Sequence, residues 1–557
     1  MRANKILLLA ASLATLAFLV WAAAEENLLR DWREHQKRYR SMLPEDARGE
    51  FRVQLRQIVV PALRTTDRCV TCHVGMAPGE PGIAGDPLFA PHPDVVHDPA
   101  EYGCVVCHGG QGLATEEADA HGTAPHWPAP MIPRRYAHAG CGSCHTHLAV
   151  PSIDRFERGK RLFERLDCLA CHAMDGRGGT IRPGGAAGIA APDLSRADAS
   201  GTDESWYLKH LAAHEEAADG PWRASFGPIA EEDREAIETY LASRVSAPGL
   251  VEAKALFHSL GCRGCHKVGG VGGDDGPDLT QAGERDPGQT DFSAVEGARD
   301  LAAWFAEHLR APASVVPESQ MPALGLSEEE IDRLVFFTFS LRRSPFPEAY
   351  WPIDRIRAER FGEREFAGDG ATLYGTFCAA CHGDRGQGMR YAGMLPFPAI
   401  ANEDFLSIAS DSLIRQTIRR GRAGRRMPAW GDAEGGLRPV EIERIVRHLR
   451  DLGGVEAPEE TGPARWAKGD AAEGARLYSA SCAGCHGGTG AGAEGPSLAD
   501  PVLLGSATDT YLAETIARGR RGTTMEAFAR PSTTRPAYSR EEIESIVTFL
   551  RTWEKRS

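Results

Sequence analysis

The sequence predicts a mainly α-helical protein: an N-terminal transmembrane helix, a loop-rich segment, and four small helical domains in tandem. Three observations lead to this fold class. An uncharged apolar run lies near the N-terminus, at Ile6–Ala24. Along residues 153–557, an apolar-aromatic pair, a Cys-His motif, a Gly-rich stretch and an amphipathic helix follow one another four times. Three further Cys-His motifs are crowded into residues 69–145, among many Gly and Pro residues.

Length and composition limit the class of protein further. The chain has 557 residues, which is enough for about four or five domains of ordinary size. With 42% hydrophobic and 25% charged residues, neither wholesale disorder nor a polytopic membrane protein is expected. The net charge of −14 argues against a nucleic-acid partner, because phosphate binding needs a basic face. The sequence has no Walker loop, so nucleotide chemistry is not predicted either.

The N-terminus predicts export across the cytoplasmic membrane. The positively charged segment Met1–Lys5 precedes Ile6–Ala24, which is long enough to span a bilayer. Ala22-Ala23-Ala24 would also suit a cleaved signal. We favour an uncleaved anchor over residues 1–24, because the charged helical stretch Glu25–Arg40 follows directly. In both interpretations the positive residues stay inside and the bulk of the chain lies on the periplasmic side.

The cysteines are confined to one motif. All 14 fall in copies of C-x-x-C-H, and no cysteine is left over. The seven copies comprise Cys69, Cys72 and His73; Cys104, Cys107 and His108; Cys141, Cys144 and His145; Cys168, Cys171 and His172; Cys262, Cys265 and His266; Cys378, Cys381 and His382; and Cys482, Cys485 and His486.

This motif is typical of covalent haem c attachment. The two thiols can form thioethers with the two haem vinyl groups, and the histidine that follows binds the iron. A structural zinc site would need its ligands in sets of four, without a histidine directly after every second cysteine. The sequence therefore predicts seven covalently bound haem c groups.

Four of the motifs stand in a repeated context. Each is preceded by a Leu-aromatic pair: Leu162-Phe163, Leu256-Phe257, Leu373-Tyr374 and Leu477-Tyr478. Each is followed by an amphipathic helix with apolar residues at i, i+3, i+4 and i+7, predicted over 231–241, 328–341, 440–452 and 540–553. An N-terminal helix that carries haem and a closing helix that crosses it resemble the class I cytochrome c fold. The resemblance covers about residues 155–557 in four copies.

These patterns predict the domain boundaries. They are an anchor over 1–24, a juxtamembrane helical segment over 25–64, a tri-haem segment over 65–152, cytochrome c domains over 153–246 and 247–343, a linker over 344–366, a third cytochrome c domain over 367–453, a linker over 454–468 and a fourth cytochrome c domain over 469–557.

The segment that contains the first three motifs is too short for a separate apolar core around each haem, so we expect the haems themselves to hold it together. Gln57–Cys69, Tyr102–Gly112 and Ala120-His121-Gly122 resemble the N-terminal part of multihaem cytochrome subunits found with quinol-oxidising membrane complexes. The resemblance implies a membrane quinol-oxidising complex, with a b-type cytochrome or similar component, as electron donor.

The class I resemblance also implies methionine as the sixth iron ligand, which raises the reduction potential relative to histidine. Met321, Met427 and Met525 each lie between the motif and the closing helix, where that family places its ligand. Met525 departs from the family pattern, because Glu526 follows it in place of proline.

The fourth haem domain has no methionine at the corresponding position. His210 aligns with His308, which lies in a domain that already has Met321, so a structural role is expected for both histidines. His214 has no such counterpart and is our candidate ligand. Three possibilities stay open: His214 binds the iron, a histidine from the N-terminal segment binds it, or the iron has an open position.

Histidine is expected as the sixth ligand of the first three haems, since neutral imidazole suits iron. His97 and His121 are the first choices, with His92 or His126 completing the set.

Taken together, these features predict a membrane-anchored electron carrier that delivers electrons to a soluble redox carrier or a terminal oxidase. No catalytic residue is predicted. The alternative is a multihaem oxidoreductase of the peroxidase or nitrogen-oxide reductase type, acting at an open haem in domain four.

Overall fold

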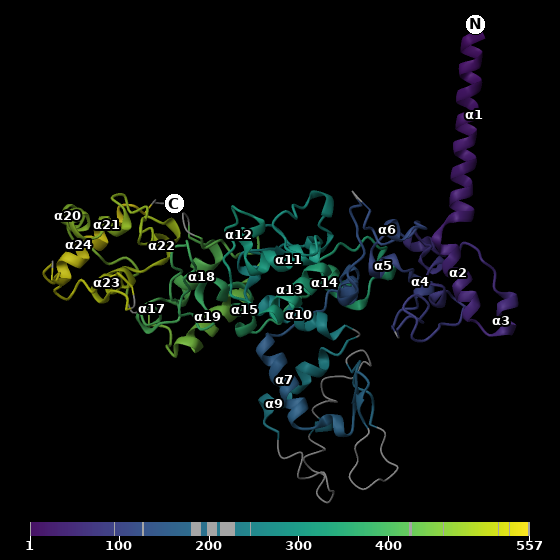
Figure 1. Ribbon diagram of the computed structural model, residues 1–557. Coiled ribbons are helices and arrows are strands. Elements are labelled where there is room, and N and C mark those ends of the chain that lie inside the picture. The colour runs from purple at the N-terminus through teal and green to yellow at the C-terminus, as the bar shows by residue number, and fades with distance from the viewer. Residues whose placement is uncertain are drawn as a thin grey trace, which may run out of the picture. The chain divides into compact units, whose positions relative to one another are not determined.

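The computed structural model describes residues 2–93, 95–124, 127–179, 191–197, 209–211, 229–245, 247–422, 426–459, 462–521, 523–533 and 535–554. The described chain is mainly helical, with short two-stranded antiparallel sheets, which confirms the predicted fold class (Figure 1). It divides into two compact units. The first comprises Met1–His145, Gln281–Ala306 and Thr338–Ile356, and the second comprises Thr146–Thr280, Glu307–Phe337 and Arg357–Ser557.

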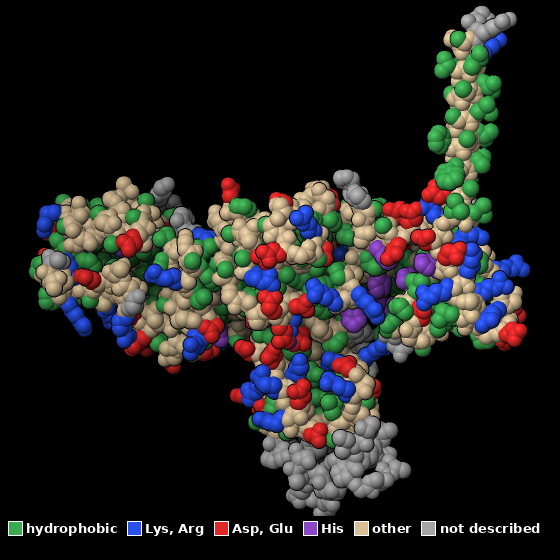
Figure 2. Space-filling view, viewed as in Figure 1, with side chains coloured by type: hydrophobic (Ala, Val, Ile, Leu, Met, Phe, Trp, Pro, Cys, Tyr) green, Lys and Arg blue, Asp and Glu red, His purple; other side chains and the backbone are tan. Residues whose placement is uncertain are grey.

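The first unit begins with a long apolar helix, α1 (Arg2–Ala24). Its segment Ala3–Ala24 has a mean hydropathy of 2.4, and none of it is buried in the protein. Apolar side chains cover the helix along its length (Figure 2), and Phe18 is 74% exposed. A helix of this length and composition is suited to the hydrocarbon core of a bilayer, where its side chains would be shielded from water.

The rest of the first unit consists of short elements and loops. Its helices are α2 (Asp31–Met42), α3 (Glu45–Glu50), α4 (Pro99–Tyr102), α5 (Val105–His108) and α6 (Glu117–Ala120), and its strands are β1 (Ile58–Val60) and β2 (Thr65–Asp67). The strands pair antiparallel, with Ile58 opposite Asp67. In α2, the buried Gln36 side chain donates to the carbonyl of Thr71 at 2.8 Å, which ties this helix to the first motif.

The second unit contains the helix pairs that the repeat predicts. Its main elements are α7 (Ile153–Arg165), α9 (Glu231–Ala242), α10 (Pro248–Ser259), α12 (Pro312–Val315), α15 (Gly370–Phe377), α16 (Ala379–His382), α17 (Glu403–Leu406), α18 (Asp411–Arg420), α19 (Pro439–Gly453), α20 (Ala471–Ser481), α21 (Ala483–His486), α22 (Pro501–Ser506), α23 (Asp509–Arg518) and α24 (Arg540–Arg551). Strand β3 (Ala173–Met174) pairs with β4 (Arg177–Gly178), and β5 (Lys267–Val268) pairs with β6 (Val271–Gly272). The remaining helices are α11 (Leu301–Arg310), α13 (Glu328–Ser340) and α14 (Ile353–Phe361).

The four predicted closing helices correspond to α9, α13, α19 and α24. Helix α24 begins where the sequence offers a capping box: the Ser539 hydroxyl accepts from the Glu542 amide, and the Glu542 carboxylate accepts from the Ser539 amide.

A glycine permits the closest approach of the paired helices. A Cβ added at Gly474 of α20 would meet the carbonyl oxygen of Ser545 in α24 at 2.0 Å, and one added at Gly159 of α7 would meet the carbonyl oxygen of Ala236 in α9 at 1.9 Å. Since neither glycine has a side chain, the two backbones touch. The closing helix is thereby held against the helix that leads into the motif.

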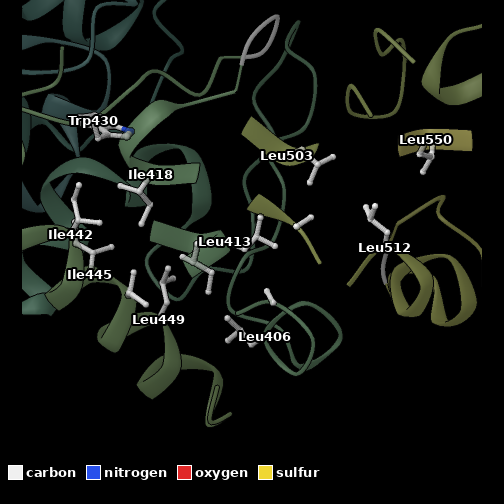
Figure 3. Close-up of a cluster of buried hydrophobic side chains, with 14 of the residues drawn as sticks. Leu406, Leu413, Ile418, Trp430, Ile442, Ile445, Leu449, Leu503, Leu512 and Leu550 are labelled. Atoms are coloured by element: carbon white, nitrogen blue, oxygen red, sulfur yellow. The ribbon is translucent and has the colours of Figure 1, made fainter. Parts of the chain in front are cut away.

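Apolar side chains from the last two predicted domains form one continuous core (Figure 3). Leu413 on α18 and Ile445 on α19 belong to it, as do Leu503 on α22 and Leu550 on α24. All four are at most 5% exposed. Because the core is shared, these two domains stabilise one another.

Replacing Gly474 with alanine should destabilise the C-terminal part of the protein. The added methyl group forces α20 and α24 apart, and such overpacking costs about 1–3 kcal/mol. Thermal unfolding followed by circular dichroism should show a lower transition temperature. Gly505→Ala is the matched control, because a Cβ there meets nothing within 4 Å. Equal transition temperatures in the two variants would contradict the role given to Gly474.

Candidate haem-binding sites

Each C-x-x-C-H motif folds into the same tight turn. In all seven, the backbone amide of the histidine donates to the carbonyl of the first cysteine, at 2.8–3.0 Å. This i→i+4 bond forms one helical turn, which brings the first thiol and the imidazole to the same side of the backbone. All 14 thiols are free of disulfide bonds. The residues therefore fit covalent attachment of haem c.

The ring of the motif histidine is oriented by a second hydrogen bond in most motifs. The Nδ1–H group donates to a backbone carbonyl: His73 to Leu88 at 3.3 Å, His172 to Pro192 at 2.8 Å, His266 to Pro277 at 2.8 Å, His382 to Pro398 at 2.9 Å and His486 to Pro496 at 2.8 Å. This bond fixes the tautomer and leaves the Nε2 lone pair available for iron. Burial lowers the pKa of His73, His266 and His382, which favours the neutral form that a metal needs.

In the first unit, three of the predicted histidines face motif histidines. The ring centroids of His73 and His121 lie 6.4 Å apart, those of His108 and His92 lie 6.1 Å apart, and those of His145 and His97 lie 6.1 Å apart. Figure 2 shows histidine side chains gathered on one face beside α4 and α5. His126 lies outside the described residues.

The spacing of these pairs fits a metal between the rings. Two imidazoles bound to opposite sides of one metal by bonds of about 2 Å have ring centroids about 6 Å apart. The planes meet at 30° in the pair His73–His121 and at 66° in the pair His92–His108.

The fourth motif also has a histidine opposite it. The ring of His210 lies 5.9 Å from that of His172, with 69° between the planes. This separation fits a second ligand of the fourth site, although the alignment with His308 predicts a structural role for His210. Met174 of the same domain is buried and accepts a hydrogen bond from the Tyr240 hydroxyl at 3.4 Å. His214 lies outside the described residues.

The last two motifs open into one cavity of about 2460 Å³. Its lining includes Cys378, His382 and Met427 from one predicted domain, and Cys482, Cys485, His486 and Met525 from the next. Ordinary ligand pockets measure about 300–1,000 Å³, so this cavity has room for two large prosthetic groups. Among the described residues, its lining includes Met321 but not His266, so the cavity does not bring these two residues together.

Neighbouring motifs touch one another through their backbones. A Cβ added at Gly140, which precedes the third motif, would meet the carbonyl oxygen of Cys107 in the second motif at 1.8 Å. Gly261, which precedes the fifth motif, has φ of 72°, and a Cβ there would meet the amide nitrogen of Ala380 at 2.7 Å. The attachment points of successive motifs are therefore in contact.

Asp67 connects the first and second motifs and was missed by the sequence analysis. Its fully buried carboxylate accepts from the amides of Cys104 and Val105, the latter at 3.2 Å. Burial raises the pKa of Asp67. The position of Asp67, two residues before Cys69, carries no sequence pattern that distinguishes it from a surface carboxylate.

Two family models match the chain. The model described as cytochrome c oxidase, cbb3-type, subunit III, matches residues 366–449 and 469–550, and the model described as cytochrome c matches residues 156–244 and 250–341.

Similar curated proteins include a cbb3-type cytochrome c oxidase subunit FixP from Bradyrhizobium sp. (strain ORS 278), 34% identical over 163 residues, which are 28% of this chain and 51% of that protein. A CcoP subunit from Azospirillum sp. (strain B510) is 30% identical over 179 residues, which are 29% of this chain and 55% of that protein. The chain thus spans about half the length of the curated relatives it matches. Among solved structures, a reducing HAO-like protein complex from Kuenenia stuttgartiensis is 20% identical, covers 33% of this chain and 96% of its own, and has a TM-score of 0.23.

The buried carboxylate of Asp67 should be essential for the packing of the second motif. In Asp67→Ala the amides of Cys104 and Val105 lose their acceptor, at a cost of about 1–3 kcal/mol for each buried group. Asp67→Asn is the matched control, since its amide oxygen can still accept. Urea unfolding monitored by haem absorbance should show that the alanine variant is the less stable. Equal midpoints for the two variants would be inconsistent with this role.

Proposed function

We propose that this chain, a multihaem c-type cytochrome with a role in electron transfer, binds seven haem c groups. It carries electrons from a membrane quinol-oxidising complex to a periplasmic acceptor. Haem c supplies one-electron chemistry when bound, while the protein determines spacing and axial ligation. The observation that carries this proposal is the close approach of neighbouring motifs, of Gly140 to Cys107 and of Gly261 to Ala380. Electron transfer needs short gaps, and these contacts shorten them.

The proposed axial ligands define a direction for the electrons. His121, His92 and His97 would complete the first three sites, and His210 the fourth; the ring separations of about 6 Å support this assignment. Met427 and Met525, which line the cavity of the last two motifs, would complete those two sites, and Met321 is the candidate that the sequence offers for the fifth. Methionine raises the reduction potential relative to histidine, so electrons would move from the His-rich N-terminal sites to the Met-containing C-terminal sites.

The anchor and the relatives support a membrane setting. Helix α1 is apolar throughout its segment Ala3–Ala24, and Arg2 and Lys5 lie at its start. A positive N-terminus is retained on the cytoplasmic side, so the motifs would lie on the periplasmic side. Relatives named as subunits of cbb3-type cytochrome c oxidases support a membrane redox complex as partner, with a terminal oxidase or a soluble carrier as the acceptor.

The alternative, an oxidoreductase acting at domain four, requires an open iron face opposite His172. The ring of His210 lies at 5.9 Å on that side, at the separation expected for a second ligand. This arrangement favours a carrier over an enzyme at this site.

If His210 is the sixth ligand, His210→Ala should convert one low-spin site to a high-spin site that binds carbon monoxide after reduction. Electron paramagnetic resonance and the carbon monoxide difference spectrum measure the two effects. His214→Ala is the matched control and should leave both spectra unchanged. A high-spin signal only in the His214 variant would instead identify His214 as the ligand, and a high-spin site already present in the wild type would favour the enzyme alternative.

The transfer route is tested in membranes that contain the full-length protein. A pyridine haemochrome assay should give seven haem c groups per chain. Added quinol should reduce all of them in the absence of oxygen, and an inhibitor of the quinol-oxidising complex should prevent the reduction. A lower haem count in fully matured protein, or failure of quinol to reduce the haems, would refute the proposed function.

A further inference from the structure

One motif histidine has a different hydrogen-bond acceptor. The Nδ1 atom of His145 lies 3.2 Å from both carboxylate oxygens of Asp354. In five other motifs the corresponding acceptor is a backbone carbonyl. The His145 side chain is 31% exposed and that of Asp354 is 19% exposed, so water screens the contact only in part.

The neighbouring residue holds Asp354 in this position. The Nε–H group of Arg355 donates to the carbonyl of Cys144 at 2.6 Å, and its Nη2 lies 3.4 Å from the carbonyl oxygen of Gly142. Both acceptors belong to the third motif. The first turn of α14 is therefore bonded to the turn that presents His145, and the backbone of Asp354 is held beside His145.

The same segment also reaches the opposite side of this site. The ring of Tyr350 contacts that of Tyr102 at 6.0 Å between centroids, and Tyr102 contacts His97 at 4.9 Å. Phe346 and Tyr350 pack against the buried cluster that contains Ile58 and Val70. Residues 346–355, which lie in the predicted linker 344–366, thus support both histidines of the third site.

A carboxylate acceptor affects the imidazole more strongly than a carbonyl does. A charge-assisted hydrogen bond draws the Nδ1 proton toward the acceptor and makes the ring a more basic ligand. A more basic ligand stabilises ferric iron over ferrous iron. The negative charge beside the site acts in the same direction, because it favours the more positive oxidation state.

We propose that Asp354 is a positioning residue that lowers the reduction potential of the third haem. The inference rests on the proposed function, because it requires a haem at Cys141, Cys144 and His145. The third site would then pass an electron readily to a more oxidising site and retain one only briefly.

The test is a redox titration at constant pH of the full-length protein, monitored by absorbance and electron paramagnetic resonance. In Asp354→Asn, the midpoint potential of one haem should become more positive by about 59 mV for its one-electron couple. This shift corresponds to a change of about tenfold in the ratio of oxidised to reduced haem at a fixed potential. The low-spin signal of that haem should change with it, and the other couples should stay in place. Glu348→Gln, which removes a charge from an exposed residue of the same segment, should leave every couple unchanged.

Unchanged midpoints in Asp354→Asn, with all seven haems present, would overturn the proposal and leave the proposed function intact. An equal shift in Glu348→Gln would overturn it too, because general charge removal would then explain the effect. If Asp354→Asn loses a haem, Asp354→Ser is measured instead; loss of the same haem there would assign Asp354 to haem attachment and also overturn the proposal. A wild-type count below seven would refute the proposed function itself.

Discussion

The hydrogen bond from the histidine amide to the carbonyl of the first cysteine is the interaction on which the sites depend. It recurs in every motif at 2.8–3.0 Å and places thiol and imidazole on one side of the chain. Because the turn is local, the chain can present it from two very different settings. One is a pair of crossed helices with an apolar core, and the other is a loop-rich segment with few helices.

Different interactions stabilise the motifs in the two settings. In the second unit, backbone contact at Gly159 and Gly474 lets the closing helices pack directly on the helices that precede the motifs. Apolar residues such as Leu413 and Leu550 belong to a shared cluster and line the cavity of the last two motifs. In the first unit, buried polar groups lie beside two smaller apolar clusters. Gln36 bonds to Thr71, and Asp67 bonds to Cys104. Buried polar groups of this kind specify one arrangement, because any other would leave them without partners.

The differences among the sites lie in the groups around the histidines rather than in the motifs. His172 and His145 belong to motifs of the same pattern, yet the Nδ1–H of His172 donates to a carbonyl and that of His145 faces the Asp354 carboxylate. The opposite face varies as well, with histidine opposite four of the motifs and methionine lining the cavity of the last two. A protein tunes a metal site through its axial ligands and through the groups that hydrogen-bond to those ligands.

The sequence by itself determined the features that depend on local pattern. These are the apolar helix α1, the attachment turns and the closing helices, of which α9 (Glu231–Ala242) follows the predicted span 231–241 almost residue for residue. Spacing and periodicity along the chain suffice for these elements, because their hydrogen bonds and apolar faces join residues close in sequence. Only the tertiary structure decided which distant residues meet: His97 with His145, His210 with His172, and Asp354 with His145. A single histidine or aspartate has no periodicity, so its partner is determined by how the loops between them fold.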